Sequence, residues 1–248
     1  MTIRLDVLGT ATPYPRPGNA CSGYLVTGPG ARIWLDAGTG TLAELQRYVR
    51  PDELDAIWVS HAHADHAADL LTAYYALRFA DLRPAAPIPL YGPPGLGDRL
   101  ARFLGGDAAP SPVHRAFAVH ELYDGHRVEV GGVTLTARAV EHDVPAFAVR
   151  IAAGDVAVAY SGDTAPCAAL TDLAAGCDLL LCEADGARPD EAHHTPEDAG
   201  ATATTAAVGR LVLTHVGPFL TGTDAVERAA AVFRGPVTLA TPGEALVV

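Results

Sequence analysis

The sequence contains no lysine, so all 17 of its basic residues are arginine. Acidic residues number 29, which leaves a formal charge of −12 when the histidines are neutral. The arginines form no run of four, and a broad nucleic-acid-binding surface needs clustered basic side chains to contact phosphates. We therefore expect no stable nucleic-acid binding. Together with abundant alanine, glycine and proline, the missing lysine reflects the bias of a GC-rich genome.

Long hydrophobic runs and disulfide-type cysteine spacings are also absent. No apolar stretch reaches the ~18 residues of a membrane span, and the N-terminus carries Asp6 where a signal peptide would have its apolar core. The four cysteines form no CxxC pair, so we expect buried thiols in a reducing compartment. They are Cys21, Cys167, Cys177 and Cys182. These absences predict a cytoplasmic protein without a membrane partner.

The rest of the composition is typical of a compact protein. Hydrophobic residues make up 49% of the 248-residue chain, and no low-complexity segment interrupts it. A chain of this length buries roughly 70–75% of the surface that it exposes when unfolded. We therefore expect residues 1–248 to form a single domain.

One short stretch concentrates metal-binding chemistry. Four ligand-type side chains follow the apolar run 56–59, which predicts a buried strand; they are His61, His63, Asp65 and His66. Alternate residues of an extended chain face the same side, so the first three can face one hollow. A helix that begins near residue 64 then turns His66 toward a second point. Imidazoles and carboxylates suit zinc, manganese or iron, so this stretch predicts a metal site rather than a solvated loop.

The order of the predicted elements indicates the architecture. Strand patterns pair as hairpins early in each half of the chain and alternate with helical patterns later, which favours an α/β (α+β) fold arranged as an αββα sandwich. The expected strands cover residues 3–8, 22–27, 31–35, 56–59, 88–91, 127–130, 133–140, 146–151, 156–161, 179–182, 210–213 and 237–240. The expected helices cover residues 41–49, 64–79, 95–104, a segment from 196, and 224–233. Thr41 and Thr195 are the predicted N-caps.

Three more ligand-type residues each follow a predicted strand. They are His142, Asp163 and His215. Any one of them alone would be an ordinary loop residue. Residues at strand ends along one edge of a sandwich can converge, however, even when they are far apart in sequence. With the stretch 61–66 present, they predict one shared metal centre.

With these residues identified, the chain resembles the metallo-β-lactamase superfamily, and within it the ribonuclease Z-like branch. The matching motifs begin with His-x-His-x-Asp-His at 61–66 and extend over nearly the whole chain. The others are Val-Leu-Gly-Thr-Ala-Thr-Pro at 7–13, Leu-Asp-Ala-Gly-Thr-Gly at 35–40, His-Asp-Val-Pro at 142–145, Ser-Gly-Asp-Thr at 161–164, Cys-Glu-Ala at 182–184, His-His-Thr at 193–195 and Leu-Thr-His at 213–215. The resemblance implies a metallo-β-lactamase fold and a metal-dependent hydrolase.

The resemblance also implies a ligand set for two divalent ions. Carried over by motif, each ion takes three residues and one carboxylate bridges the ions: His61, His63 and His142; Asp65, His66 and His215; and Asp163 as the bridge. Di-iron relatives that reduce oxygen or nitric oxide resemble this chain but carry glutamate at the position of His63. That difference favours Zn²⁺ and hydrolysis, with Mn²⁺ or Fe²⁺ as the other possible ions.

A further imidazole resembles the His-x-Ser/Thr element of this branch, at the start of the helix from 196. The match assigns the role to His193 rather than to His194, and an ordinary surface imidazole is the alternative reading. We interpret Asp36 as a brace for the metal loop, whereas Glu183 either orients a ligand or caps a strand. The histidines outside every motif are expected in surface loops; they are His114, His120 and His126.

The predicted chemistry is hydrolysis by a metal-bound hydroxide, which Asp65 would orient while His193 protonates the leaving group. The paired ions would attract one anionic group even though the surface as a whole is acidic. We expect a phosphodiesterase acting on a small or cyclic phosphodiester. The alternatives are a hydrolase of a lactone, ester or thioester and, from another class, a non-catalytic metal-bearing regulatory protein.

One departure from ribonuclease Z limits the choice of substrate. The ribonucleases that process transfer RNA insert a substrate-gripping arm between the third histidine and the bridging aspartate. Here that interval, from His142 to Asp163, is 21 residues long and is filled by a predicted hairpin. We therefore expect no processing of transfer RNA, and the smaller phosphodiesterases, including those acting on cyclic phosphates, are the closer comparison.

The substrate is expected to be a small, anionic molecule. Candidates for lining its pocket are Tyr14, Arg16, Tyr74, Tyr75 and Phe79, although most of them are expected to pack in the core or in loops. The family resemblance also implies a homodimer, for which the residues themselves give no evidence.

Overall fold

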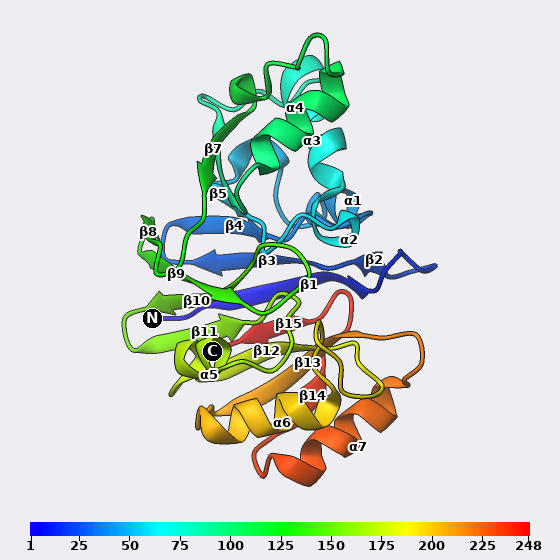
Figure 1. The fold of residues 1–248 in the computed structure, drawn as a ribbon. Coiled ribbons are helices and arrows are strands. Elements are labelled where there is room, and N and C mark those ends of the chain that lie inside the picture. Colours follow the sequence, from blue (N-terminus) through cyan, green and yellow to red (C-terminus); the bar gives the residue numbers. More distant parts are fainter.

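Two β-sheets face each other in the middle of the molecule, and helices cover the outer face of each sheet (Figure 1). This arrangement comes from a computed structural model that describes residues 1–248. It confirms the αββα sandwich that the sequence predicts.

The two sheets are built from different strands and are of similar size. The first contains, in spatial order, β15 (Ala245–Val247), β1 (Arg4–Ala11), β3 (Gly23–Gly28), β4 (Ala31–Leu35), β5 (Ala56–Trp58), β6 (Ile88–Gly92) and β7 (Phe117–Glu121), with β2 (Ala20–Cys21) paired to β1. The second contains β14 (Val237–Leu239), β13 (Arg210–Val216), β12 (Leu179–Ala184), β11 (Val156–Tyr160), β10 (Ala146–Ala153), β9 (Val133–Val140) and β8 (Arg127–Val130).

The helices divide between the two outer faces. On the first sheet lie α1 (Thr41–Leu45), α2 (Ala64–Ala67), α3 (Asp69–Phe79) and α4 (Leu96–Gly105). On the second lie α5 (Ala168–Ala174), α6 (Pro196–Thr205) and α7 (Gly222–Val232). Two short 3₁₀ helices, Pro51–Glu53 and Val113–Arg115, complete the inventory.

One layer of buried side chains fills the space between the sheets, and a further layer lies beneath each set of helices. In β12, Leu179 and Leu181 belong to the middle layer, whereas Leu180 and Cys182 pack beneath the helices. Because successive residues point to opposite faces, a strand covered on both sides is apolar throughout. Both sheets contribute to the middle layer, so we propose that the whole chain is one domain.

The strand order brings the ligand-type residues to one edge of the sandwich. Strands β11, β12 and β13 are parallel neighbours, and β9 runs in the same direction because β10 is antiparallel to both β9 and β11. Their carboxyl ends, and the residues that follow them, therefore share one edge. The first sheet joins this edge through the backbone, because the Phe147 N–H donates to the carbonyl of Ser60 at 3.0 Å.

Several local predictions are corrected by the structure. Elements β2, β7, β15 and α5 were not expected, because each is short or has few apolar side chains to form a periodic pattern. Thr195 caps α6 as predicted and accepts a hydrogen bond from the Asp198 N–H at 3.1 Å. Thr41 does not cap α1: Gly40 is the N-cap at a φ of 95°, and the Thr41 hydroxyl donates to the Gly38 carbonyl at 2.6 Å.

The three histidines outside the motifs differ from the predicted surface loops in part. His114 is exposed but lies in the 3₁₀ helix Val113–Arg115, and His120 is exposed on β7, where its ring stacks on Tyr91 with centroids 4.9 Å apart. His126 is half-buried beside Tyr123. No helix is both long enough and apolar enough to cross a membrane.

Candidate metal centre and active-site cavity

The loop between β5 and α2 is held in place by the buried carboxylate of Asp36. This carboxylate accepts hydrogen bonds from the Ser60 N–H at 2.7 Å and the Ser60 hydroxyl at 2.8 Å. It also accepts from the Tyr160 hydroxyl and from His66 Nδ1, each at 2.7 Å. Asp36 therefore fixes both the course of the loop and the orientation of the His66 ring, which matches the bracing role expected for it.

The first group of ligand-type residues contains only imidazoles. His61 Nε2 lies 3.1 Å from His63 Nδ1, and His142 Nε2 lies 3.3 Å from the same atom. One nitrogen from each of the three rings lies within 4.8 Å of the others. Because His142 Nδ1 donates to the Ala192 carbonyl at 2.9 Å, its Nε2 is free to face the centre.

Asp163 lies between this group and a second one. Its carboxylate oxygens are 3.6 Å from His61 Nε2, 3.3 Å from His66 Nε2 and 3.3 Å from His215 Nε2. The second group brings ligand atoms of Asp65, His66 and His215 within 4.8 Å of one another. The structure therefore brings all seven predicted ligand residues together at one edge of the sandwich.

Two buried atoms at this centre test whether it fits a metal. His66 Nε2 and Asp163 Oδ1 lie 3.3 Å apart, yet neither has a hydrogen-bond partner. A buried polar atom without a partner costs roughly 1–3 kcal/mol, so such atoms need another ligand. Imidazole nitrogens and carboxylate oxygens at this density are the donors that Zn²⁺, Mn²⁺ and Fe²⁺ accept. The residues fit a metal centre.

Protonation at the centre also suits metal binding. Burial, reinforced by His66, keeps the pKa of His61 well below its usual value, which leaves a neutral ring with a lone pair to donate. Burial alone would raise the pKa of Asp163, but His215, His66 and His61 hold that pKa well below the usual range. Asp163 is therefore a carboxylate despite its burial.

An imidazole–carboxylate pair, His193 and Glu183, lies beside the ligand groups. His193 Nδ1 donates to Glu183 Oε1 at 3.0 Å, and its Nε2 faces the cavity, 3.8 Å from Asp185 Oδ2. Burial is the largest single influence and lowers the pKa of His193, but the hydrogen bond to Glu183 and the negative charges of Glu183, Asp163 and Asp185 together outweigh it and raise the pKa to about 9. Glu183 also accepts from the N–H groups of Thr164 and Asp185, so it both orients His193 and caps the end of β12.

His194 has a structural position. It is buried, with Nδ1 donating to the Thr164 carbonyl at 2.6 Å and Nε2 lying 3.2 Å from the Thr202 hydroxyl. The neighbouring imidazoles therefore point in different directions, and His193 is the one that reaches the cavity.

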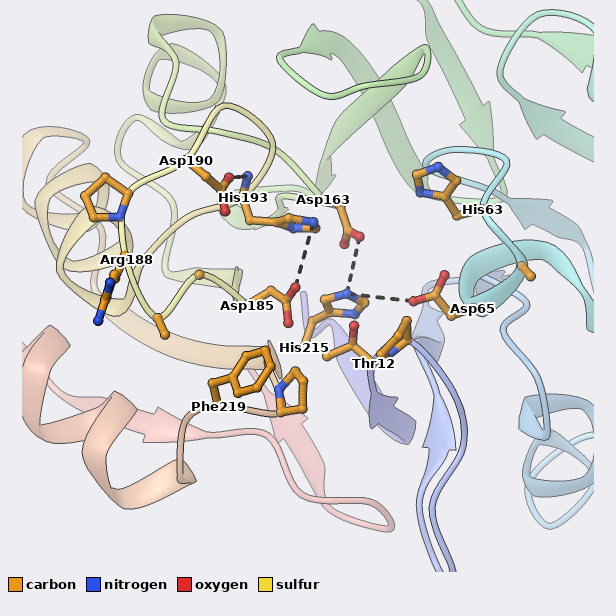
Figure 2. Close-up of a pocket in the computed structure, with 16 residues that line it drawn as sticks. Thr12, His63, Asp65, Asp163, Asp185, Arg188, Asp190, His193, His215 and Phe219 are labelled. Atoms are coloured by element: carbon orange, nitrogen blue, oxygen red, sulfur yellow. Dashed lines mark hydrogen bonds and ion pairs between the residues drawn. The ribbon is translucent and has the colours of Figure 1, made fainter.

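The centre opens into a cavity with a volume of about 1030 Å³. Figure 2 shows Asp65, Asp163, His63 and His215 on one side of this cavity and Asp185, Arg188, His193 and Phe219 on the other. The remaining lining residues are Thr12, Pro13, Ala64, Gly186, Ala187, Pro189, Asp190 and Pro218.

The predicted pocket aromatics do not line this cavity. Tyr74 is buried and accepts a hydrogen bond from the Ser111 hydroxyl, and Arg16 lies 3.9 Å above the ring of Tyr14. Tyr75 and Phe79 pack at the end of α3. Three lining residues were not predicted: Asp185, Arg188 and Phe219. The one signal in the sequence is that Asp185 and Phe219 closely follow strand ends that carry Glu183 and His215.

Comparisons with known proteins agree with this geometry. A family model described as a β-lactamase superfamily domain matches residues 31–216. An uncharacterised protein of Mycobacterium tuberculosis (strain ATCC 25618 / H37Rv) is 35% identical, covering 96% of this chain and 89% of that protein. A ribonuclease Z of Mycobacterium sp. (strain KMS) is 32% identical, with coverages of 92% and 90%.

A solved structure extends the likeness to the fold. The crystal structure of the metallo-β-lactamase fold protein YhfI from Bacillus subtilis has a TM-score of 0.88 and 26% identity and covers 100% of both chains. With the motif-bearing loops gathered at one edge of the sandwich, the chain belongs to the β-lactamase superfamily domain family and is a metal-dependent hydrolase with the metallo-β-lactamase fold.

Proposed function

We propose that the chain is a binuclear metal-dependent phosphodiesterase that acts on a small or cyclic phosphodiester. The observation that supports this most strongly is the position of Asp163, within 3.6 Å of imidazoles from both ligand groups and beside the His193–Glu183 pair. The lactone, ester or thioester alternative shares the ligand groups; among these, a thioester releases a thiolate and so has less need for a proton donor beside them.

The ligand sets follow the geometry of the two groups. His61, His63 and His142 would hold one ion, and Asp65, His66 and His215 would hold the other, with Asp163 between them. We propose Zn²⁺ at both positions, because imidazole predominates among the donors, with Mn²⁺ or Fe²⁺ also compatible. Bound ions of this kind lower the pKa of coordinated water and neutralise the charge of a phosphate.

The chain's own residues complete the reaction. Asp65 lines the cavity next to the second ligand group, where its carboxylate can orient the attacking water. The pKa of His193 is raised to about 9 in the protein alone, which favours the protonated ring, and its Nε2 can donate to a departing alkoxide. Glu183 fixes the ring through Nδ1 and so keeps the Nε2 proton directed into the cavity.

The relatives and the hairpin support a phosphodiester of limited size. One relative with 32% identity is a ribonuclease, an enzyme class that cleaves phosphodiesters. Between His142 and Asp163, however, β10 and β11 pair over Val149–Ala153 and Val156–Tyr160 and connect directly. No arm extends from this segment to grip a transfer RNA. The charge of −12 further favours a small anionic substrate over a nucleic acid.

Turnover measured side by side tests this function. Metal-loaded protein is expected to hydrolyse a cyclic phosphodiester at a higher kcat/KM than a matched carboxylic ester or lactone. A higher kcat/KM for the ester or lactone would reverse the assignment. We also propose a homodimer, from the family resemblance alone, and light scattering of the purified protein measures it directly.

A further inference from the structure

We infer that Phe219 and Arg188 form a recognition wall: the face of Phe219 binds a planar ring on the organic group of the substrate, and Arg188 attracts its negative charge. The inference rests on the proposed function for the phosphate end of the substrate. It adds a chemical class for the other end, a phosphodiester that carries an aromatic or heteroaromatic ring.

The exposure and position of Phe219 are the first observation. Its side chain is 89% exposed, although it lines the same cavity as His215 and Asp163. In Figure 2 its ring stands at the border of this cavity. A single exposed aromatic residue is ordinary on a protein surface, but one at the mouth of a catalytic cavity offers a free π-face to whatever enters.

The backbone holds Phe219 in place. The segment Gly217–Leu220 is a turn closed by the Leu220 N–H donating to the Gly217 carbonyl at 3.1 Å. Proline follows the first residue of this turn, which limits its backbone freedom. A Cβ at Gly217 would collide with the carbonyl oxygen and Oδ1 of Asp185, so only glycine allows the two loops to approach this closely. Phe219 is therefore presented on a fixed turn.

Arg188 is the second observation. It is exposed and is the only arginine among the residues that line the cavity, and it forms no ion pair with any carboxylate. Its loop is fastened to α7, because Arg228 Nη2 donates to the Ala187 carbonyl at 3.2 Å. In a chain with a charge of −12, an unpaired guanidinium in the lining of this cavity supplies positive charge that can attract an anion.

The size of the cavity is the third observation. Ligand cavities commonly measure about 300–1000 Å³, so a volume of about 1030 Å³ exceeds what one phosphate needs. The phosphate would occupy the end beside Asp163, and the wall formed by Phe219 and Arg188 lies across the cavity from Asp65 (Figure 2). The space between them suits the organic group of the substrate.

Two probes of equal carbon count separate ring stacking from simple hydrophobic burial. Benzyl phosphate carries a planar ring, whereas cyclohexylmethyl phosphate carries a puckered one. Calorimetry on metal-loaded protein should show benzyl phosphate binding about three- to tenfold more tightly. Phe219→Leu, which keeps apolar bulk but loses the π-face, should remove this preference, while Phe79→Leu, at an aromatic residue that is 64% exposed outside the cavity, should leave it unchanged.

Arg188→Gln tests the charge separately and should weaken both phosphates alike, by about two- to fivefold. Equal affinities of wild-type protein for the two phosphates, or an unchanged preference in Phe219→Leu, would overturn the role of Phe219. Unchanged affinities in Arg188→Gln would overturn that of Arg188. Turnover of the diester benzyl methyl phosphate tests the proposed function separately. The dissociation constants of the two monoester probes can be measured whether or not this diester is cleaved.

Discussion

The two walls of the cavity are built in different ways. On the metal side, His66 is backed by Asp36 and His215 lies 2.8 Å from the buried hydroxyl of Ser22. On the opposite side, Arg188 and Phe219 project from loops, and the Arg188 guanidinium forms no ion pair with a carboxylate. The first wall, on the metal side, is held by buried hydrogen bonds. The second wall, formed by Arg188 and Phe219, has a fixed backbone and exposed side chains.

This difference separates chemistry from selection. Metal ligands must keep their geometry, so their orienting partners are buried and tightly hydrogen bonded. Residues that contact the variable part of a substrate lie on loops at the mouth, where replacement does not disturb the core. Substitutions of the metal ligands and of their orienting partners should therefore change metal content, whereas substitutions of Arg188 and Phe219 should change substrate affinity.

The largest effect is expected at Asp163, because it lies between the two ligand groups. Asp163→Ala should lower metal content from about two equivalents to well below one and remove essentially all turnover. His142→Ala should lose mainly one equivalent, since it belongs to only one group. Elemental analysis of both variants measures this difference. Equal loss of both ions in the two variants would contradict a bridging position for Asp163.

His193 should have the next largest effect, without loss of metal. His193→Ala should slow cleavage of an alkoxide-releasing diester by roughly 10²–10⁴-fold and slow a nitrophenyl diester much less, because nitrophenolate needs little protonation. His114→Ala, at an exposed position outside the cavity, is the control. If His193→Ala loses an ion instead, the residue is a ligand or a brace rather than a proton donor.

The pH profile tests the same role. A general acid acts while protonated, so the contribution of His193 is present below its pKa and is lost as pH rises through that value. With a pKa of about 9 in the protein alone, and cations bound nearby to lower it, kcat/KM should fall at or below about pH 9. Glu183→Gln should shift this fall in kcat/KM to lower pH. If the kcat/KM of His193→Ala falls over the same pH range as that of the wild type, His193 is not the group responsible for the fall.

Asp36 should have a smaller effect, chiefly on metal binding. Asp36→Asn weakens the hydrogen bond that orients His66 and should lower metal affinity about 10- to 100-fold. Competition with a chelator measures this affinity, and excess metal should restore most of the turnover. Failure of excess metal to restore turnover in folded protein would contradict a role limited to holding the loop and the His66 ring.

His194 should affect only the stability of the fold. His194→Ala leaves the Thr164 carbonyl and the Thr202 hydroxyl without their partner, so it should lower the free energy of unfolding by about 1–3 kcal/mol. Urea denaturation measures this loss, and kcat at a temperature where the variant is folded should stay within a few-fold of wild type. A loss of kcat as large as that of His193→Ala would contradict this structural role.

The sequence allowed the first wall to be predicted, but not the second. His61, Asp163 and His215 follow apolar strand patterns, and ligand chemistry at strand ends is visible in sequence because the residue types are few and specific. Arg188 and Phe219 are common residues in loops, and their importance comes from a close approach of two loops at Gly217 that no local pattern records. Tyr75 and Phe79, named as candidates for lining the pocket, are exposed on α3 and do not line the cavity.

The metal stoichiometry tests the central proposal most directly. Protein purified without chelators, loaded with Zn²⁺ and freed of excess ion should contain about two equivalents per chain by elemental analysis, because the ligand residues form two groups of three with Asp163 between them. We predict two ions and a loss of turnover when chelation removes them. One equivalent in metal-replete protein, or none, would contradict the binuclear centre.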